Sequence, residues 1–197
     1  MKNTMTCAPN HVPETYMTRD EFVAWYERQP DDCRYERIHG IIVAKTLQTV
    51  GHVRCKMAAC MAFERSIKDA GLTDCEALLG GILVQAADSD VIPDGLVRCG
   101  PHLPNDAIFV PDPVIVVEVL SPDTEILDRT TKRLLYFKLP SVRHYLMIWS
   151  NEPRIVRHTR LSTGSFATDV FKIGPIPLDP PGISVTVEEF YSDWSSA

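Results

Sequence analysis

The chain has 197 residues, with 20 basic and 26 acidic side chains and a net charge of −6. This length predicts one domain that can bury its own core, and the acidic balance argues against avid, non-specific binding to nucleic acid. It does not exclude a nuclease, because a local groove can be basic on an acidic protein. No run approaches the roughly 18 apolar residues that cross a bilayer, so we expect no membrane partner.

The cysteines are scattered along the chain and include no C-x-x-C pair. This spacing gives no support for a zinc site, and residues 1–13 lack the apolar stretch of a signal peptide. We therefore expect a cytoplasmic protein with reduced thiols and no disulfide framework. Residues 1–17 are expected to be a disordered lead-in and residues 18–197 a single domain. The cysteines are Cys7, Cys33, Cys55, Cys60, Cys75 and Cys99.

Two helices are expected in the first third of the chain. Thr18 and Glu21 have the spacing of a capping box, so a short helix should cover residues 21–29. Apolar residues recur at three and four positions through residues 49–70, which predicts a longer helix. His52 lies in its first turn, where it could equally be a polar residue that touches solvent or backbone.

A hairpin is expected between these helices. Residues 34–38 and 41–44 alternate as strands do, and Gly40 suits the turn between them. Tyr35 and Glu36 must point to opposite faces of their strand. The sequence leaves open which of the two faces inward.

The middle of the chain is expected to contain three strands. Residues 80–85 and 93–97 form two of them, separated by a loop over residues 86–91, and residues 100–112 are a long connection. Residues 114–120 are almost continuously apolar and β-branched, which is typical of a strand buried on both faces.

Glu118 is the exception in that apolar strand. Its carboxylate should cost several kcal/mol to bury unless a cation meets it. Asp94 and Lys132 are its natural companions, because two carboxylates with a lysine are the parts of a divalent-metal phosphodiesterase site.

A helix over residues 128–137 should place Asp128, Lys132 and Tyr136 on one face, because they are spaced by four residues. The chain should then close with an antiparallel meander, an extended proline-rich segment and a short terminal helix. These elements are expected at residues 143–149, 154–159 and 166–171, at residues 175–182, and at residues 186–191.

An ordered set of motifs runs through the chain: Tyr35-Glu36 with Gly40, Pro93-Asp94, E-V-L-S-P-D-T at residues 118–124, and D-R-x-x-K-x-x-x-Y at residues 128–136. Over about residues 18–191 this set resembles the Uma-two endonuclease family of the restriction-endonuclease-like PD-(D/E)XK superfamily. The resemblance implies an α/β fold, with a mixed central β-sheet flanked by helices and an antiparallel β-meander in the C-terminal third.

The resemblance also implies a metal-dependent endonuclease that hydrolyses DNA phosphodiester bonds. Asp94 and Glu118 would bind Mg²⁺ or Mn²⁺, with Glu36 as a further ligand or supporting residue. The superfamily normally has a lysine two residues after the glutamate, where this chain has Leu120. The resemblance implies that the lysine has migrated to the following helix, with Lys132 as the candidate.

Other outcomes stay open at this point. His52, Asp128 and Arg129 are candidates for the rim of the site, although Asp128 and Lys132 could form only a surface ion pair. Tyr136 is expected to face the core rather than to act in catalysis. The fold could also serve a weak or inactive nucleic-acid-binding module, or an enzyme for RNA or another phosphoester. A homodimer would suit two-strand cleavage, although no residue requires one.

Overall fold

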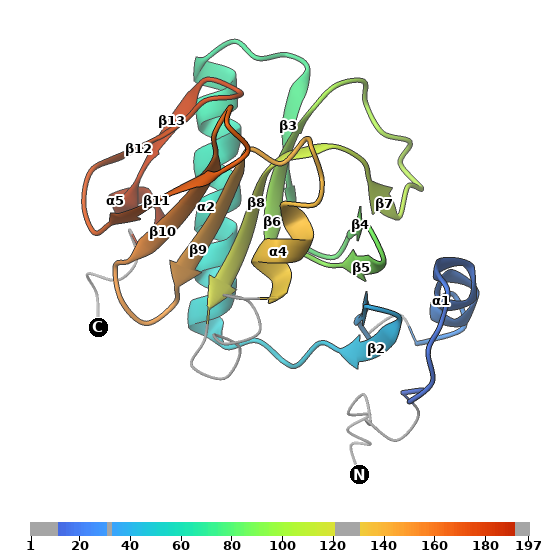
Figure 1. The fold of residues 1–197 in the computed structure, drawn as a ribbon. Coiled ribbons are helices and arrows are strands. Elements are labelled where there is room, and N and C mark those ends of the chain that lie inside the picture. Colours follow the sequence, from blue (N-terminus) through green and yellow to red (C-terminus); the bar gives the residue numbers. More distant parts are fainter. Residues whose placement is uncertain (1–11, 31–32, 121–130, 192–197) are drawn as a thin grey trace.

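The computed structural model describes residues 12–30, 33–120 and 131–191. At its centre is a six-stranded sheet in the order β11-β10-β9-β8-β6-β3 (Figure 1). β8 and β9 run parallel, and the other neighbours run antiparallel. The predicted mixed sheet and its C-terminal meander are thus confirmed. The bounds are β3 (Cys75–Leu79), β6 (Gly95–Cys99), β8 (Pro113–Leu120), β9 (His144–Trp149), β10 (Ile155–Arg160) and β11 (Phe166–Phe171).

A second, smaller sheet has the order β2-β1-β5-β4-β7, and a separate hairpin pairs β12 with β13. The strands are β1 (Tyr35–Ile38), β2 (Ile41–Ala44), β4 (Leu83–Ala86), β5 (Ser89–Val91), β7 (Phe109–Val110), β12 (Pro175–Leu178) and β13 (Ile183–Thr186). The helices are α1 (Arg19–Tyr26), α2 (Val50–Asp69), α4 (Arg133–Tyr136) and α5 (Val187–Phe190). None of the helices in the described ranges is long and apolar enough to cross a membrane.

β8 is buried on both faces, as its apolar sequence predicts. Val117 and Val119 belong to the core cluster that includes Phe63 of α2, whereas Val116 and Leu120 pack in the cluster between the central sheet, α4 and the smaller sheet. Figure 1 shows α2 and α4 on opposite faces of the central sheet. Each such side chain contributes about 1.5–3 kcal/mol by burial. β8 therefore stabilises the packing on both faces of the central sheet.

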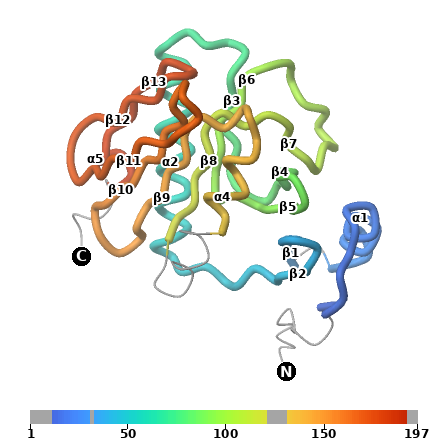
Figure 2. The backbone as a smooth tube through the Cα atoms, in the orientation of Figure 1, coloured from blue at the N-terminus to red at the C-terminus, as the bar shows by residue number. Residues whose placement is uncertain are grey.

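The two predicted helices in the first third are confirmed with small shifts. The Thr18–Glu21 capping box is present and α1 ends at Tyr26, three residues earlier than expected. Thr49 caps α2 by accepting a hydrogen bond from the backbone N–H of His52, at 3.2 Å. The connection from β2 to α2 carries the chain from the smaller sheet to the central one (Figure 2).

Tyr35 and Glu36 lie on opposite faces of β1, and both are buried. His39 and Gly40 both have positive φ, 50° and 81°, so a two-residue turn links β1 to β2. Tyr35 packs its ring 4.7 Å from that of Trp25 in α1. Glu36 points the other way, toward α4.

Several strand predictions were wrong in their limits. Residues 86–91 are not a loop, because β5 pairs with β4 in a hairpin. Its Asp90 is fully buried through ion pairs with Arg19 and Arg37, at 2.7 and 2.6 Å. These contacts join residues more than 50 positions apart, so no local pattern reveals the strand. β3, β7 and β13 were also missed. Of the predicted helix over residues 128–137, residues 131–136 are helical, and residues 128–130 lie outside the described residues.

The prediction that the cysteines are reduced was wrong for Cys33, Cys75 and Cys99. Cys75 and Cys99 lie directly opposite each other in the β3–β6 ladder, with Cα atoms 4.0 Å apart, and form a disulfide. Cys33 is also disulfide-bonded, whereas Cys55 and Cys60 are free thiols. The pairing depends on strand register, which the sequence spacing does not reveal.

The predicted lead-in falls partly outside the described residues, namely residues 1–11. Residues 12–17 are described, and Met17 donates its backbone N–H to the carbonyl of Gly40 at 2.8 Å. Val12 and Met17 pack beside the core cluster under α1.

Gly80 packs closely against the backbone of Pro93 and Asp94, which precede β6. Its N–H donates to the carbonyl of Asp94 at 2.9 Å, and a Cβ atom there would lie 2.5 Å from the carbonyl oxygen of Pro93. We expect Gly80→Ala to lower the free energy of unfolding by about 1–3 kcal/mol, since backbone must shift to make room.

Gly51→Ala is the matched control, because its Cβ would lie 3.5 Å from the carbonyl oxygen of Ser150, an ordinary contact. Urea denaturation should show this variant unchanged, or more stable by up to about 1 kcal/mol from helix propensity. Equal stability of Gly80→Ala and wild type would show that the Pro93–Asp94 backbone has room that the structure does not indicate.

Candidate functional site

Glu118 lies in the interior of β8 with its side chain 1% exposed. Its Oε1 atom accepts hydrogen bonds from the Tyr136 hydroxyl at 2.9 Å and from Lys132 Nζ at 3.1 Å. Both donors come from one face of the α4 segment, as their four-residue spacing predicts. The cation expected beside the buried glutamate is therefore present.

Lys132 also reaches a second carboxylate. Its Nζ lies 3.0 Å from Oε1 of Glu36 in β1, and only 4% of the lysine side chain is exposed. Glu36 is 3% exposed and accepts the backbone N–H of Ile92 at 2.8 Å. One ammonium group thus bridges carboxylates from the smaller sheet and the central sheet.

Lys45 adds a second cation beside Glu36. It follows β2, and its Nζ lies 3.6 Å from Glu36 Oε1 while donating to the carbonyl of Ile92 at 2.8 Å. Its side chain is 18% exposed, so it lies nearer to solvent than Lys132.

Asp94, immediately before β6, is fixed by the backbone of the central sheet. Its N–H donates to the carbonyl of Val117 at 3.0 Å, and its Oδ2 accepts the N–H of Val119 at 2.9 Å. The Asp94 carboxylate therefore lies beside the residue that follows Glu118. The tight packing of Gly80 against the Asp94 backbone supports the same position.

Side chains at the start of α2 complete the surroundings of Asp94. His52 Nε2 lies 3.1 Å from Oδ2, and Lys56 Nζ lies 3.2 Å from Oδ1. Gln48, which precedes the helix, donates to Oδ1 at 3.1 Å. His52 and Lys56 are four positions apart in α2, so they reach Asp94 from one face of the helix.

The surrounding cations favour ionised carboxylates. Burial raises the pKa of Glu36, but the charges of Lys132 and Lys45 outweigh it and hold that pKa below its ordinary value. Burial likewise raises the pKa of Asp94, but the contact from His52 and the charge of Lys45 outweigh it and hold that pKa well below its ordinary value. Both groups are therefore anionic at neutral pH.

Tyr136 is held in its neutral form. Complete burial, and next the negative charge of Glu118, raise its pKa well above 10. The expectation that Tyr136 faces the core is confirmed, and its hydroxyl also acts as a fixed donor to Glu118.

The residues present fit a divalent cation by their chemistry. Asp94, Glu118 and Glu36 offer oxygen donors only, which suit Mg²⁺ and Mn²⁺. Mg²⁺ is usually held by one or two carboxylates together with waters and substrate oxygens. Over the described ranges, no group of three or more His, Cys, Asp and Glu side chains is arranged to hold a metal ion.

The structure brings together most of the predicted site residues. Glu36, Glu118 and Lys132 are in direct contact, and His52 touches Asp94 rather than solvent alone. Asp128 and Arg129 lie outside the described residues. Whether these side chains perform catalysis stays a prediction.

Sequence reasoning missed three residues of this site, Lys45, Gln48 and Lys56. The i, i+4 spacing of His52 and Lys56 was a usable signal, because it puts both on one helical face. Lys45 and Gln48 lie in the irregular connection between β2 and α2, where no periodicity predicts direction.

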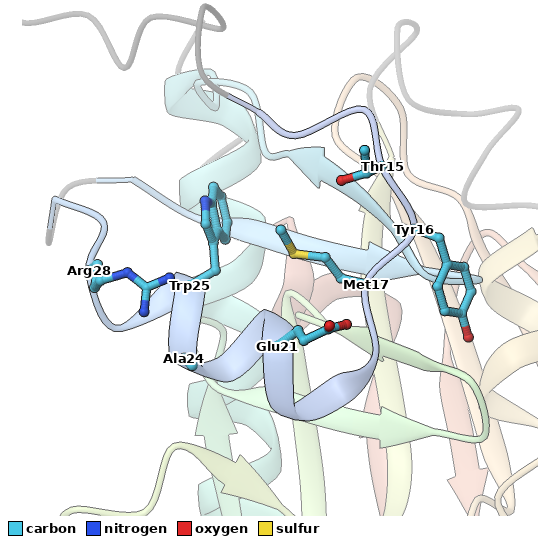
Figure 3. A pocket seen from close by; sticks show the side chains of 7 residues that line it. All are labelled: Thr15, Tyr16, Met17, Glu21, Ala24, Trp25 and Arg28. Carbon is cyan, nitrogen blue, oxygen red and sulfur yellow. The ribbon is translucent and has the colours of Figure 1, made fainter.

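A pocket of about 370 Å³ lies elsewhere, between residues 15–17 and α1. Figure 3 shows Trp25, Glu21 and Arg28 of the α1 region around it. Its lining includes none of the predicted site residues.

Comparisons with known proteins show the family and the fold of this chain. The profile of the Uma2 family, described as "Putative restriction endonuclease", matches residues 19–188. An uncharacterized protein of Synechocystis sp. (strain PCC 6803) is 28% identical over 183 residues, which cover 91% of this chain and 94% of that protein. The crystal structure of "a putative nuclease belonging to DUF820" from Anabaena variabilis superposes with a TM-score of 0.69 at 20% identity, covering 89% of this chain and 98% of that one.

Removing the Lys132 ammonium group, which contacts both Glu36 and Glu118, should destabilise the protein strongly. We expect Lys132→Met to lower the free energy of unfolding by about 3–5 kcal/mol, because two buried carboxylates lose their common partner. Lys138→Met is the control, since this lysine is 46% exposed and lies 3.7 Å from the exposed Asp88. Urea denaturation at pH 7 should show a change within about 0.5 kcal/mol for the control. Equal losses in both variants would contradict the bridging role.

Acid should remove the stabilisation that Glu36 and Asp94 provide. Their pKa values are lowered in the folded protein from ordinary values of 4.5 and 3.8. The stabilisation is therefore complete above those values and is lost as the pH falls below them through the folded pKa values. Unfolding free energies between pH 7 and pH 3 should fall less steeply for Glu36→Gln than for wild type.

Asp69→Asn is the matched control for this pH series, because its side chain is 72% exposed. It should keep the pH slope of the wild type. A wild-type protein whose stability is constant or rises on acidification would contradict the account.

Proposed function

Because the chain belongs to the Uma2 family, we propose that it is a metal-dependent endonuclease that hydrolyses DNA phosphodiester bonds. The observation that carries this proposal is a buried cluster in which Lys132 bridges Glu36 and Glu118. Buried Asp94 lies next to it along β8, where its Oδ2 accepts the N–H of Val119. Such a cluster is costly to maintain in a protein interior unless its charges serve a purpose. The nuclease-like fold of the superposed structure supports the same class of reaction.

In this proposal Asp94 and Glu118 hold Mg²⁺ or Mn²⁺, with Glu36 assisting. The metal would polarise the phosphoryl oxygen and lower the pKa of the attacking water. Asp94 and Glu36 are already in the anionic form that metal binding requires, because the contact from His52 and nearby lysine charges lower the pKa of Asp94 and lysine charges lower the pKa of Glu36.

Lys132 and Tyr136 have supporting roles in the proposed reaction. The ammonium group of Lys132 would orient the water or stabilise the charge that develops on the phosphoryl oxygens. In hydrolysis water adds to phosphorus, the bond to the leaving oxygen breaks, and that oxygen takes up a proton. The Tyr136 hydroxyl fixes Glu118 Oε1 throughout, because its raised pKa keeps its proton in place.

One observation favours a second candidate, a nucleic-acid-binding module with little activity. Each of the three carboxylates already has a lysine within 3.2 Å, so a metal must compete with a resident cation. A reaction on RNA or another phosphoester would use the same residues. We place either function in the cytoplasm, with a homodimer as the arrangement suited to cutting two strands.

Cleavage of supercoiled plasmid DNA tests the proposal. Wild-type protein should cut it with Mg²⁺ or Mn²⁺ and not with EDTA. Glu118→Gln and Asp94→Asn should lose activity by about 100-fold or more, because each removes a negative charge that would hold the metal. Asp69→Asn should cut as well as wild type, and circular dichroism should show all variants folded.

Equal cleavage by the folded site variants and wild type would remove the assignment of these carboxylates. Tight DNA binding without cleavage under any metal would support the module instead. Cleavage of RNA or of a small phosphodiester, but not of DNA, would identify a different substrate.

A further inference from the structure

The two carboxylate oxygens of Asp94 have different kinds of contact. Oδ2 is held by the backbone N–H of Val119 at 2.9 Å and lies 3.1 Å from His52, a ring that is 8% exposed. Oδ1 is contacted by two long side chains, Gln48 at 3.1 Å and Lys56 at 3.2 Å. Oδ2 is therefore fixed by rigid groups, whereas the contacts of Oδ1 can change by side-chain rotation.

Lys56 and Lys132 also differ in how firmly they are held. Lys132 bridges Glu36 and Glu118 and has 4% of its side chain exposed, so moving it would leave two buried carboxylates without their shared cation. Lys56 contacts Asp94 and donates to the side-chain oxygen Oε1 of Gln48, and 14% of its side chain is exposed. Of these two lysines, Lys56 is the one that can move at lower cost.

Asp94 tolerates the departure of Lys56 better than its burial suggests. His52 and the backbone N–H of Val119 stay on Oδ2, and Lys45 acts on the same carboxylate through its charge. The residue that needs a new contact is Lys56 itself. A lysine ammonium is a flexible point charge that binds phosphate readily.

We propose that Lys56 neutralises Asp94 Oδ1 in the metal-free protein and moves to a substrate phosphate when a divalent cation binds there. This inference rests on the proposed function of the Asp94 site. A metal and an ammonium group repel each other at one carboxylate oxygen, so they occupy it in turn. The displaced lysine stays attached to α2 beside Asp94 and is partly exposed, so it can meet the negatively charged backbone of DNA.

Lys56 would thus contact the substrate phosphate, a task that the superfamily gives to a lysine on the strand of the glutamate. Leu120 cannot bind phosphate, and Lys132 has to serve two carboxylates in addition to its proposed role in the reaction. Lys56 would therefore add a second cation at the phosphate. Lys56 approaches from the helix on the opposite face of the sheet from α4 (Figure 1). Asp94 also keeps a positive partner in both states, because Lys56 neutralises it without metal and the divalent cation neutralises it when bound.

Metal affinity and DNA affinity test the two halves of the proposal separately. Mn²⁺ binding measured by calorimetry should be tighter in Lys56→Met than in wild type, on the order of tenfold, because a competing cation in direct contact is gone. DNA binding measured by anisotropy in Ca²⁺ should weaken, and its logarithmic salt slope should fall by about one, as expected for one lost phosphate contact.

Lys56→Arg should restore the DNA affinity and salt slope toward wild type, because it keeps the positive charge. Lys68→Met is the matched control, since this lysine lies on the same helix about 18 Å further along the axis. It should leave Mn²⁺ affinity unchanged.

Each contrary result has a definite meaning. Unchanged or weaker Mn²⁺ binding in Lys56→Met would overturn the exchange, and tighter Mn²⁺ binding with unaltered DNA binding would overturn the move to phosphate. If wild type binds Mn²⁺ and DNA but cuts nothing, the proposed nuclease activity fails while the exchange is still decided by these measurements. If no variant binds Mn²⁺, both proposals fail.

Discussion

A single ammonium group joins the two sheets at the proposed site. Lys132 Nζ lies 3.0 Å from Glu36 Oε1 and 3.1 Å from Glu118 Oε1, and all three side chains are almost completely buried. Because isolated charges are costly in an interior, the positions of β1, β8 and the α4 segment depend on one another. Tyr136 reinforces the contact from the next helical turn.

Asp94, in contrast, is positioned by backbone hydrogen bonds of the central sheet. Asp94 is fixed by hydrogen bonds with Val117 and Val119, and Gly80 packs against its carbonyl side. The start of α2 then adds His52 and Lys56. Oδ2 of Asp94 is thus held by rigid groups, whereas the contacts of Oδ1 can change. The proposed replacement of Lys56 by a metal at Oδ1 depends on this difference.

The sequence predicted the centre of this arrangement because that centre breaks a local pattern. Glu118 interrupts an apolar strand, so a cationic partner was expected and Lys132 was named as the candidate. Tyr136 was expected only to face the core, and its hydrogen bond to Glu118 comes from the structure. β5 could not be expected, since its Asp90 is buried by arginines from distant parts of the chain. The Cys75–Cys99 disulfide depends likewise on a register that local sequence does not encode.

The surroundings of Asp94 were the least predictable part of the site. Lys45 and Gln48 lie in an irregular connection, and their directions are set by where β2 ends and α2 begins. His52 was identified only as a rim candidate, because its position in a first turn is equally common for residues without a role. Membership of the Uma2 family accounts for the order of the motifs, whereas the lysines around them come from the structure.

The central claim is that Asp94 and Glu118 bind a divalent metal with the help of Glu36, and that lysines neutralise these carboxylates in the metal-free protein. Anomalous diffraction from a crystal soaked in Mn²⁺ tests it most directly. The account predicts a manganese peak within bonding distance of Asp94 Oδ1 and of Glu118, with Lys56 turned away from Asp94. A structure at saturating Mn²⁺ with no peak there, and with Lys56 and Lys132 still paired to the carboxylates, would contradict it.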